Sequence, residues 1–310
     1  MDLHTHSWCS DGNLSPEALV SEAAAGGVTV LALTDHDGTF GIDEAVEAGQ
    51  RMGVCVVGGV EFSSFLDTWD CTMHILGLGI DHREEHLRER ILWMREKRRE
   101  RNDRMLAIFR EMGISLEKEE MQVYPGQEYI GKPNIARALV NRGYASSIAE
   151  VFQSERLLAA PQLKIVRRDR VAAEEAIGLI HGAGGLAVLA HPYKVFWKGR
   201  ISPSSREFDD PVHLDYRRKL GPILDKLTAL GLDGMECFYT SHSLPETEYL
   251  CGEARRRKML ITAGSDYHGP EMRENVTLAG CWKGWEEEKL PWAVQAVGEA
   301  ARAALKRMER

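Results

Sequence analysis

Residues 28–37, VTVLALTDHD, form an apolar run that ends in three consecutive ionisable side chains. The β-branched and leucine residues of this run predict a buried β-strand, which starts directly after the helix-stopping pair Gly26-Gly27. Asp35, His36 and Asp37 stand at the end of the strand, where burial is costly unless they are paired or bind a metal. The alternative is that they cap the next helix, which leaves His36 unexplained.

Strands and helices alternate on both sides of this stretch through the first 80 residues. Ser15-Pro16-Glu17 supplies an N-cap, a first-turn proline and a first-turn acid, which together predict a helix start. Helices are expected at 15–26 and 42–52, and further strands at 2–5, 54–60 and 73–80. Strands separated by helices of about a dozen residues predict βαβ units and a parallel sheet.

The pattern changes near Asp81 and returns near Asp169. Residues 84–112 predict one long helix, and its stretch 95–104, REKRRERNDR, is almost wholly charged, so it is either solvent-exposed or bridges two domains. Further elements are expected as a helix at 171–181, strands at 186–190, 234–238, 259–263 and 276–281, a loose excursion at 194–222 and a helix at 292–308.

The simplest architecture is an α/β barrel that is split by a mainly helical insertion. We expect residues 1–83 and 166–310 to form the barrel domain and residues 84–165 to form the insertion. Active sites of such barrels lie at the loop rim at the C-terminal ends of the strands. An insertion at that rim would form a lid or one wall of the substrate pocket.

Metal-capable side chains recur in short motifs at the ends of these strands. His4 and His6 share one face of the first strand because successive side chains alternate. Asp266 and His268 share a face in the same way if the backbone stays extended. The complete candidate ligand set is His4, His6, Asp11, His36, Glu61, His74, His191, Asp266 and His268.

These nine side chains are imidazoles and carboxylates without a thiolate, a set that suits Zn, Mn or Fe(II). Nine ligands exceed what one ion takes, so two or three clustered divalent ions are expected, with Glu61 as a bridge. Clustered ions polarise a phosphoryl oxygen and generate hydroxide at neutral pH. The pattern therefore favours a metal-dependent hydrolase.

Composition narrows the class of protein further. The chain has 310 residues, 44% of them hydrophobic, and a net charge of −8, which argues against binding to long nucleic acids or anionic membranes. Its six cysteines form no C-x-x-C pair and are expected to be buried free thiols. No apolar stretch approaches the length of a transmembrane helix and no signal peptide is recognisable, so we expect a cytoplasmic protein.

The motifs H-x-H, T-D-H-D, the mid-strand Glu and His, H-P and D-x-H-G together resemble those of the polymerase-and-histidinol-phosphatase (PHP) family. This resemblance implies a distorted (β/α)7 barrel with a trinuclear metal centre. It implies one metal on His4, His6, Glu61 and Asp266, a second on Glu61, His74 and His191, and a third on Asp11, His36 and His268. Many members have histidine where Asp11 stands, which leaves the metal identity open among Mn, Fe and Zn.

Residues 131–139, GKPNIARAL, resemble the G-[RK]-P-H-[IF]-A-R-A-L stretch of the TrpH/YciV-type branch, with Asn134 in place of histidine. That branch acts on AMP, nucleoside 3′,5′-bisphosphates or short RNA 5′ ends. We therefore expect hydrolysis of a nucleotide phosphate monoester by a hydroxide held between the metal ions. The expected catalytic residues are Asp11, His36, Glu61, His191 and His242, and the expected substrate-binding residues are Lys132, Asn134, Arg137 and His242.

His242 follows a strand end, so it is expected either to touch the substrate or to donate a proton. Three alternatives to a nucleotide phosphatase remain open. The first is a histidinol-phosphate phosphatase with the same metals, the second a phosphodiesterase or exonuclease, and the third a non-catalytic sensor of metal or nucleotide.

Overall fold

The computed structural model describes the chain except residues 125–126, 128, 165, 167–168, 198–206, 271, 273–275, 286–289 and 309–310. Its central sheet follows the order β1-β2-β3-β4-β6-β8-β9. The bounds are β1 Asp2–Thr5, β2 Val30–Leu33, β3 Cys55–Leu66, β4 Cys71–Leu78, β6 Leu186–Leu189, β8 Gly234–Tyr239 and β9 Leu260–Gly264. Backbone hydrogen bonds from Asp266 to His4 and from His6 to Tyr267 bring the two ends of the sheet together. The expected distorted barrel is confirmed.

One strand runs against the others. β1, β2 and β3 are parallel, as are β6, β8 and β9, but β4 is antiparallel to both β3 and β6. The expectation of a wholly parallel sheet is therefore wrong. β3 continues past Glu61 to Leu66, and only residues 67–70, which include the short helix η1 (Asp67–Trp69), separate it from β4. A parallel return needs a crossover of a dozen or more residues, so this short link produces a hairpin.

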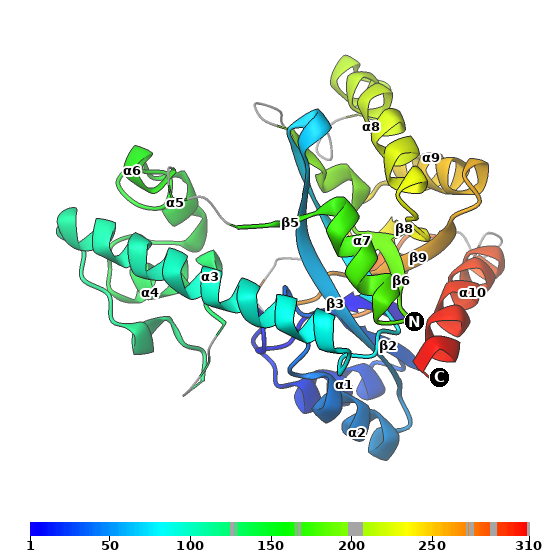
Figure 1. Ribbon diagram of the computed structural model, residues 1–310, viewed down its shortest axis with the longest axis horizontal. Coiled ribbons are helices and arrows are strands. Elements are labelled where there is room, and N and C mark those ends of the chain that lie inside the picture. The colour runs from blue at the N-terminus through cyan, green and yellow to red at the C-terminus, as the bar shows by residue number, and fades with distance from the viewer. Residues whose placement is uncertain are drawn as a thin grey trace.

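Helices cover the outside of the barrel in two main groups (Figure 1). α1 (Pro16–Ala25) and α2 (Ile42–Met52) lie together at one side, while α8 (Pro211–Ala229) and α9 (Leu244–Arg256) lie at the opposite side. α7 (Ala173–Gly182) and α10 (Leu290–Met308) lie between these groups. Ser15 caps α1 as expected, because its hydroxyl accepts a hydrogen bond from the Ala18 amide.

Two sequence expectations in the second half are wrong. The excursion at 194–222 contains the first half of α8, whose start is capped by Asp210. It also contains β7 (Phe196–Trp197), which pairs with β4. Residues 276–281 form no strand; the described backbone there enters the short helix η4 (Gly280–Trp282) instead.

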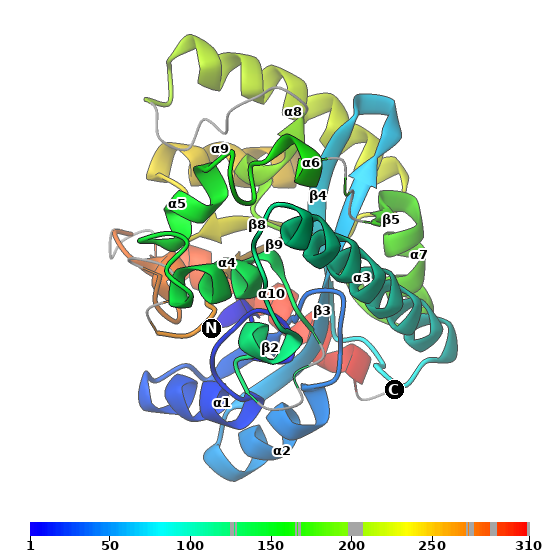
Figure 2. The same cartoon turned by 90° about the vertical axis from the view of Figure 1, so that its left-hand side faces the viewer.

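The region between β4 and β5 (Val171–Ala172) is helical and has its own apolar core, from Met105 to Leu163. Its elements are α3 (Glu85–Glu111), η2 (Lys118–Met121), α4 (Lys132–Asn141), α5 (Ile148–Gln153) and α6 (Pro161–Lys164). Figure 1 shows α3 extending from the barrel toward the other helices of this group. In Figure 2, which looks from that side, α4 to α6 lie in front of the sheet.

The charged segment of α3 bridges to the barrel rather than facing only solvent. Arg98, Arg101 and Asn102 are buried. Arg98 donates a hydrogen bond to the Asp37 carboxylate, and its guanidinium lies 4.1 Å from the centre of the Tyr129 ring. Asn102 Nδ2 donates to the Ile130 carbonyl at 2.9 Å. The sequence did not reveal this contact because, within residues 95–104, the buried positions of the helix are arginine and asparagine instead of apolar residues.

All six cysteines are free, as expected, but Cys55 is exposed, so the expectation that every thiol is buried is wrong. Within the described part of the chain, no helix combines the length and apolar character needed to cross a bilayer.

Candidate metal centre

The nine candidate ligands come from segments far apart in sequence and meet at one end of the barrel. His4 lies on β1, His6 follows directly after its last residue Thr5, and His36 follows β2. His191 follows β6 directly after Ala190, and Asp266 and His268 follow β9. His74 reaches the same end from the first half of β4, opposite Ser63 on β3, because β4 is antiparallel.

Glu61 lies at the centre of this group. Its Oε1 atom is 2.8 Å from His74 Nδ1 and 3.1 Å from His191 Nε2. Its Oε2 atom is 2.7 Å from His36 Nδ1 and 3.3 Å from His6 Nε2. Burial alone would raise the pKa of Glu61, but the charges of His36, His74 and His4 outweigh it and hold the pKa well below its usual value. The two oxygens of one carboxylate thus face different sets of imidazoles.

Asp11 and Asp266 complete the cluster on its other sides. Asp11 lies 3.2 Å from His268 Nε2 and 3.7 Å from His36 Nε2. Burial opposes ionisation of Asp11, yet the charges of His36 and His268 bring its pKa well below the usual value. Asp266 Oδ1 lies 3.3 Å from His6 Nε2 and 3.6 Å from His4 Nε2. Asp11 and Glu61 are therefore held in their anionic form.

The imidazoles differ in protonation. Burial lowers the pKa of His6 and of His191 to about 3, so both rings are neutral near pH 7 and keep a lone pair for a cation. Burial also opposes the charged form of His4, but Glu236 and Glu61 outweigh it and raise its pKa well above the usual value. His4 Nδ1 lies 3.0 Å from Glu236 Oε1, the arrangement that orients a metal-binding histidine through its second nitrogen.

The surroundings of the buried oxygen Glu61 Oε2 indicate whether cations fit this cluster. It accepts no hydrogen bond within the described residues, although nitrogen atoms surround it. His4 Nε2 and His6 Nε2 point at each other across 3.1 Å beside Glu61 and Asp266. A divalent cation would satisfy these lone pairs together, and nitrogen and carboxylate donors suit Zn, Mn or Fe. The residues present therefore fit the expected metals.

Three sets of side chains in the described residues place their ligand atoms within 4.8 Å of one another. They are His4-His6-Glu61-Asp266, His6-Asp11-His36-His268 and His36-Glu61-His74. The first set has the composition expected for the first metal. The second set contains the three residues expected for the third metal and, in addition, His6. In the third, His36 stands with Glu61 and His74 in place of the expected His191. His191 lies 3.1 Å from Glu61 Oε1, and its ring centre is 5.2 Å from that of His74. The assignment of individual ions remains a prediction.

Unusual backbone conformations orient several of these side chains. His191 and Asp266 have positive φ values of 28° and 57°, so the chain is not extended at Asp266 and the expected strand-like alternation with His268 does not apply. The His191 amide donates to Glu236 Oε2 at 2.7 Å, which holds the strained turn. Gly264 lies beside Glu236 and His4 so closely that any Cβ atom there would overlap both.

Only His36 of the T-D-H-D motif joins the cluster. Asp35 accepts hydrogen bonds from the Ser7 amide, the Ser7 hydroxyl and the Ser10 hydroxyl, so it ties two loops together. Burial raises its pKa to about 6. Asp37 accepts from the Ser63 amide and from Arg98, and the N-cap position of α2 is Gly41, which has no side-chain cap. The capping alternative for this motif is therefore wrong.

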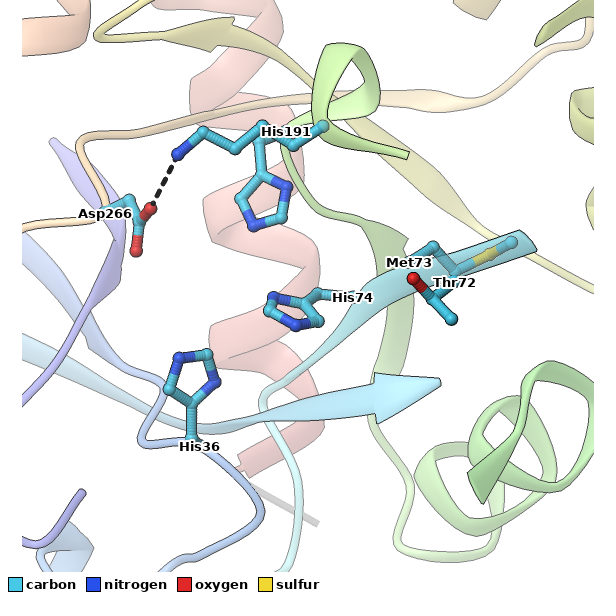
Figure 3. A pocket seen from close by; sticks show the side chains of 7 residues that line it. His36, Thr72, Met73, His74, His191 and Asp266 are labelled. Carbon is cyan, nitrogen blue, oxygen red and sulfur yellow. Dashed lines mark hydrogen bonds and ion pairs between the residues drawn. The ribbon is translucent and has the colours of Figure 1, made fainter. Parts of the chain in front are cut away.

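A cavity of about 270 Å³ opens beside the cluster. Figure 3 shows His36, His74, His191 and Asp266 around it, with Thr72 and Met73 on the β4 side. Lys194 also lines it: its ammonium group contacts the Tyr239 hydroxyl and lies 3.4 Å from Asp266 Oδ2. The Tyr239 hydroxyl donates to the same oxygen at 2.8 Å.

The four expected substrate-binding residues lie outside the described lining of this cavity. Lys132 is exposed at the start of α4, and the Asn134 side chain is buried there, accepting a hydrogen bond from the Gly131 amide at 3.0 Å. Arg137 donates to Met272 Sδ at 3.6 Å and is close enough to Asp11 for that charge to raise its pKa, against a larger lowering by burial. His242 Nδ1 lies 3.0 Å from the Cys237 carbonyl oxygen.

Sequence reasoning did not single out Glu236, Lys194 or Tyr239. Glu236 was detectable, because it is the one carboxylate inside the otherwise uncharged strand GMECFY. Lys194 stands three residues after His191 and Tyr239 ends β8, so both are far from Asp266 in the sequence. Their proximity to Asp266 comes only from closure of the barrel.

Comparison with known proteins gives the family. The PHP domain model matches residues 2–182. A 3′,5′-nucleoside bisphosphate phosphatase of Chromobacterium violaceum is 35% identical over 87% of this chain and 87% of its own length. A 5′-3′ exoribonuclease of Haemophilus influenzae is 33% identical over 89% of this chain and 94% of its own.

A solved structure from Bifidobacterium adolescentis, described as a metal-dependent phosphoesterase, is 27% identical, with a TM-score of 0.72 over 95% of both chains. The resemblance drawn from the motifs is thus confirmed. The chain belongs to the PHP domain family and is a hydrolase of its metal-dependent phosphoesterase class.

Proposed function

We propose that this protein hydrolyses a phosphate monoester of a small nucleotide, such as AMP or a nucleoside 3′,5′-bisphosphate. The observation that carries the proposal is the position of Glu61, whose two oxygens face separate groups of imidazoles beside a cavity of about 270 Å³. The relative from Chromobacterium violaceum, named for action on nucleoside bisphosphates, supports this class of substrate.

In this proposal the nine clustered side chains hold two or three divalent ions, with Glu61 shared between two of them. When bound, such ions polarise a phosphoryl oxygen and lower the pKa of water. The chain's own contribution is to keep His6 and His191 neutral through burial and to hold Asp11 and Glu61 ionised.

Lys194 is our candidate for the phosphate-binding cation. Its ammonium group lines the cavity and is held by Tyr239 and Asp266, so it faces the side from which a phosphate would reach the cluster. Residues 84–165 would act as a lid, and Lys132 and Arg137 on α4 would reach the substrate from it. Asn134 would act through the start of α4, because its side-chain oxygen is engaged by Gly131.

His242 is better suited to a role other than proton donation. A carbonyl oxygen only accepts, so His242 Nδ1 carries the proton in its contact with Cys237 and leaves the lone pair on Nε2. Burial lowers the pKa of His242 to about 4, which makes the ring neutral near pH 7. We propose that it supports Tyr239, whose ring centre lies 5.1 Å from that of His242.

The substrate class is tested by phosphate release from protein loaded with Mn, Fe(II) or Zn. The panel contains AMP, adenosine 3′,5′-bisphosphate, histidinol phosphate and a 5′-phosphorylated oligoribonucleotide. We expect the two nucleotides to give the highest kcat/KM. Preference for histidinol phosphate would identify the amino-alcohol phosphatase instead, and no release from any compound with bound metal confirmed would favour a sensor.

The two lysines are compared with the variants Lys194→Met and Lys132→Met. A phosphate-binding cation acts mainly on substrate binding, so we expect Lys194→Met to raise KM more than it lowers kcat. Lys132→Met should do the same to a smaller extent, because Lys132 is exposed on the lid. Unchanged saturation by AMP in either variant would remove that lysine from the site.

A second candidate function is removal of nucleotides from the 5′ end of short RNA, the activity for which the Haemophilus influenzae relative is named. It is favoured by a cavity of about 640 Å³ on the insertion, where Arg95, Arg99 and Lys118 contribute to the lining. This groove could follow a phosphate backbone. Release of mononucleotides from the oligoribonucleotide, with a rate that falls steeply as salt rises, would support this candidate.

A further inference from the structure

A third cavity, of about 160 Å³, lies between the insertion and the barrel loops. Three aromatic rings line it, those of Phe40, Tyr124 and Tyr129, together with Arg95, Arg98 and Asp37. It is smaller than the roughly 300 to 1,000 Å³ typical of pockets for whole drug-sized ligands, so it suits a single flat ring system.

This cavity and the metal cluster share the same two loops. Asp37 lines the cavity and directly follows His36, a candidate ligand, so their Cα atoms are about 3.8 Å apart. Cys9 lines it two residues before Asp11. Asp35 binds these loops to each other through Ser7 and Ser10. These two loops therefore carry side chains of both the cluster and this cavity, which is the arrangement that one molecule spanning the two sites requires.

Each of the three rings is already held by a neighbour. The Tyr124 ring centre lies 4.2 Å from that of Trp8. The guanidinium of Arg98 lies 4.1 Å from the Tyr129 ring centre, and that of Arg95 lies 4.3 Å from the Phe40 ring centre. Rings that are fixed before binding lose little freedom when another flat ring stacks on them. The cavity is thus a stacking surface formed in advance.

The charges of the wall favour a neutral ring over a second phosphate. Arg98 donates to Asp37, so this buried arginine and this buried carboxylate largely offset each other. A phosphate in the cavity would face the Asp37 carboxylate, which repels it. A nitrogen heterocycle instead offers N–H donors to a carboxylate and ring nitrogens or carbonyls to a guanidinium such as that of Arg95.

We propose that this cavity binds the base of the nucleotide while the phosphate lies at the metal cluster. The inference rests on the proposed nucleotide phosphatase and adds that the enzyme recognises its substrate through the base. Compounds with the same phosphate ester but no base, such as ribose 5-phosphate, would then be poor substrates. Aromatic–base stacking should make the kcat/KM for AMP about tenfold or more higher than that for ribose 5-phosphate.

The test uses the metal-loaded full chain and the ratio of kcat/KM for AMP to that for ribose 5-phosphate. Phe40 is 51% exposed, so Phe40→Ala should fold, and Tyr124→Leu provides a second variant. We expect the ratio to fall about tenfold in each. The matched control is Trp93→Ala: Trp93 is also an exposed aromatic residue covered by an arginine, Arg90 at 3.9 Å, but it lies outside the described lining of the cavity.

A ratio unchanged in both cavity variants, or lowered equally by Trp93→Ala, would overturn the base site while leaving the phosphatase intact. If the wild-type protein hydrolyses neither ester, the proposed function fails, and equilibrium binding decides the base site separately. In that arm adenosine should bind to the wild type about tenfold more tightly than to Phe40→Ala, and ribose should not bind measurably. Equal binding of adenosine to both proteins, or none to either, would also overturn it.

Discussion

The metal cluster and the contact between α3 and the barrel both bury charge, but they balance it differently. At the α3 contact, Arg98 and Asp37 offset each other within the protein, and Tyr129 covers the guanidinium. At the cluster, Asp11, Glu61 and Asp266 are surrounded by imidazoles, and two of these, His6 and His191, are neutral near pH 7.

The difference separates a structural contact from a binding site. An arginine–carboxylate pair is complete without a ligand, whereas carboxylates among imidazoles are balanced only by the protons or cations that bind there. The stability of one region should therefore depend on the protein alone, and that of the other on what is bound to it. The following predictions test this comparison.

The largest effect is expected on activity when the cluster loses a ligand. Replacing Asp266 or His191 with Ala should lower kcat/KM by more than about a hundredfold, the upper end of what losing a group next to a bound metal costs. Circular dichroism should show the fold retained. The control is His86→Ala, because His86 is an exposed residue on α3 that pairs with Glu84 and is not one of the nine candidate ligands. Wild-type turnover in either ligand variant would remove that residue from the centre.

Removing metal should destabilise the wild-type protein. Ions that bind only the folded state add about 3 kcal/mol at a hundredfold excess over Kd, so a chelator should lower Tm by several degrees and Mn or Zn should restore it. In Glu61→Gln this dependence should be much weaker, because Glu61 contacts both groups of imidazoles. Identical Tm values with and without metal in the wild type would contradict the assigned cluster.

The α3 contact should respond to a change in the protein rather than to metal. Arg98→Met leaves Asp37 buried without its cation and should lower the free energy of unfolding by about 3 kcal/mol. Arg99→Met is the control, because the neighbouring Arg99 side chain is 62% exposed and pairs with Glu96; its effect should be below about 1 kcal/mol. Urea unfolding measures both, and adding Asp37→Asn to Arg98→Met should restore part of the loss. Equal losses of unfolding free energy in the two variants would show that the contact between Arg98 and Asp37 stabilises the fold no more than an exposed ion pair does.

The smallest effect concerns His242, a buried imidazole kept neutral. Its folded-state pKa of about 4 lies below the unfolded value of about 6.5. Between these values the unfolded chain binds the extra proton, so its contribution to stability is present above about pH 6.5 and is lost as pH falls toward 4. Metal-free wild type should therefore lose more stability from pH 7 to pH 4.5 than His242→Gln. Parallel curves for the two proteins would contradict the lowered pKa.

Local sequence patterns predicted the barrel and the convergence of its ligands. The strand before His36, the Ser15 cap and the alternation of strands and helices depend on neighbouring residues, which is why they were visible in the sequence. The antiparallel direction of β4 was not visible, because it depends on the shortness of the link at 67–70. That link could be placed only once β3 was known to continue to Leu66.

Contacts between elements that are far apart in the sequence were the main features that the sequence did not predict. Nothing near Arg98 indicates that it meets Asp37, 61 residues away, and an arginine-rich helix face resembles a solvated one. Glu236 supports His4 across 232 residues, and Lys194 reaches Asp266 across 72. Such pairs arise from closure of the sheet and from packing of the insertion, which no local periodicity records.

The space around Gly264 restricts which residues can occupy that position. Because an added Cβ would meet both the Glu236 carboxylate and His4, the restriction at this position is one of volume rather than of chemistry. Even alanine, the most conservative replacement, would push the supporting carboxylate away from the imidazole that it orients. In a saturation library, position 264 should therefore tolerate as little variation as the ligand positions themselves, although it contributes no reactive atom.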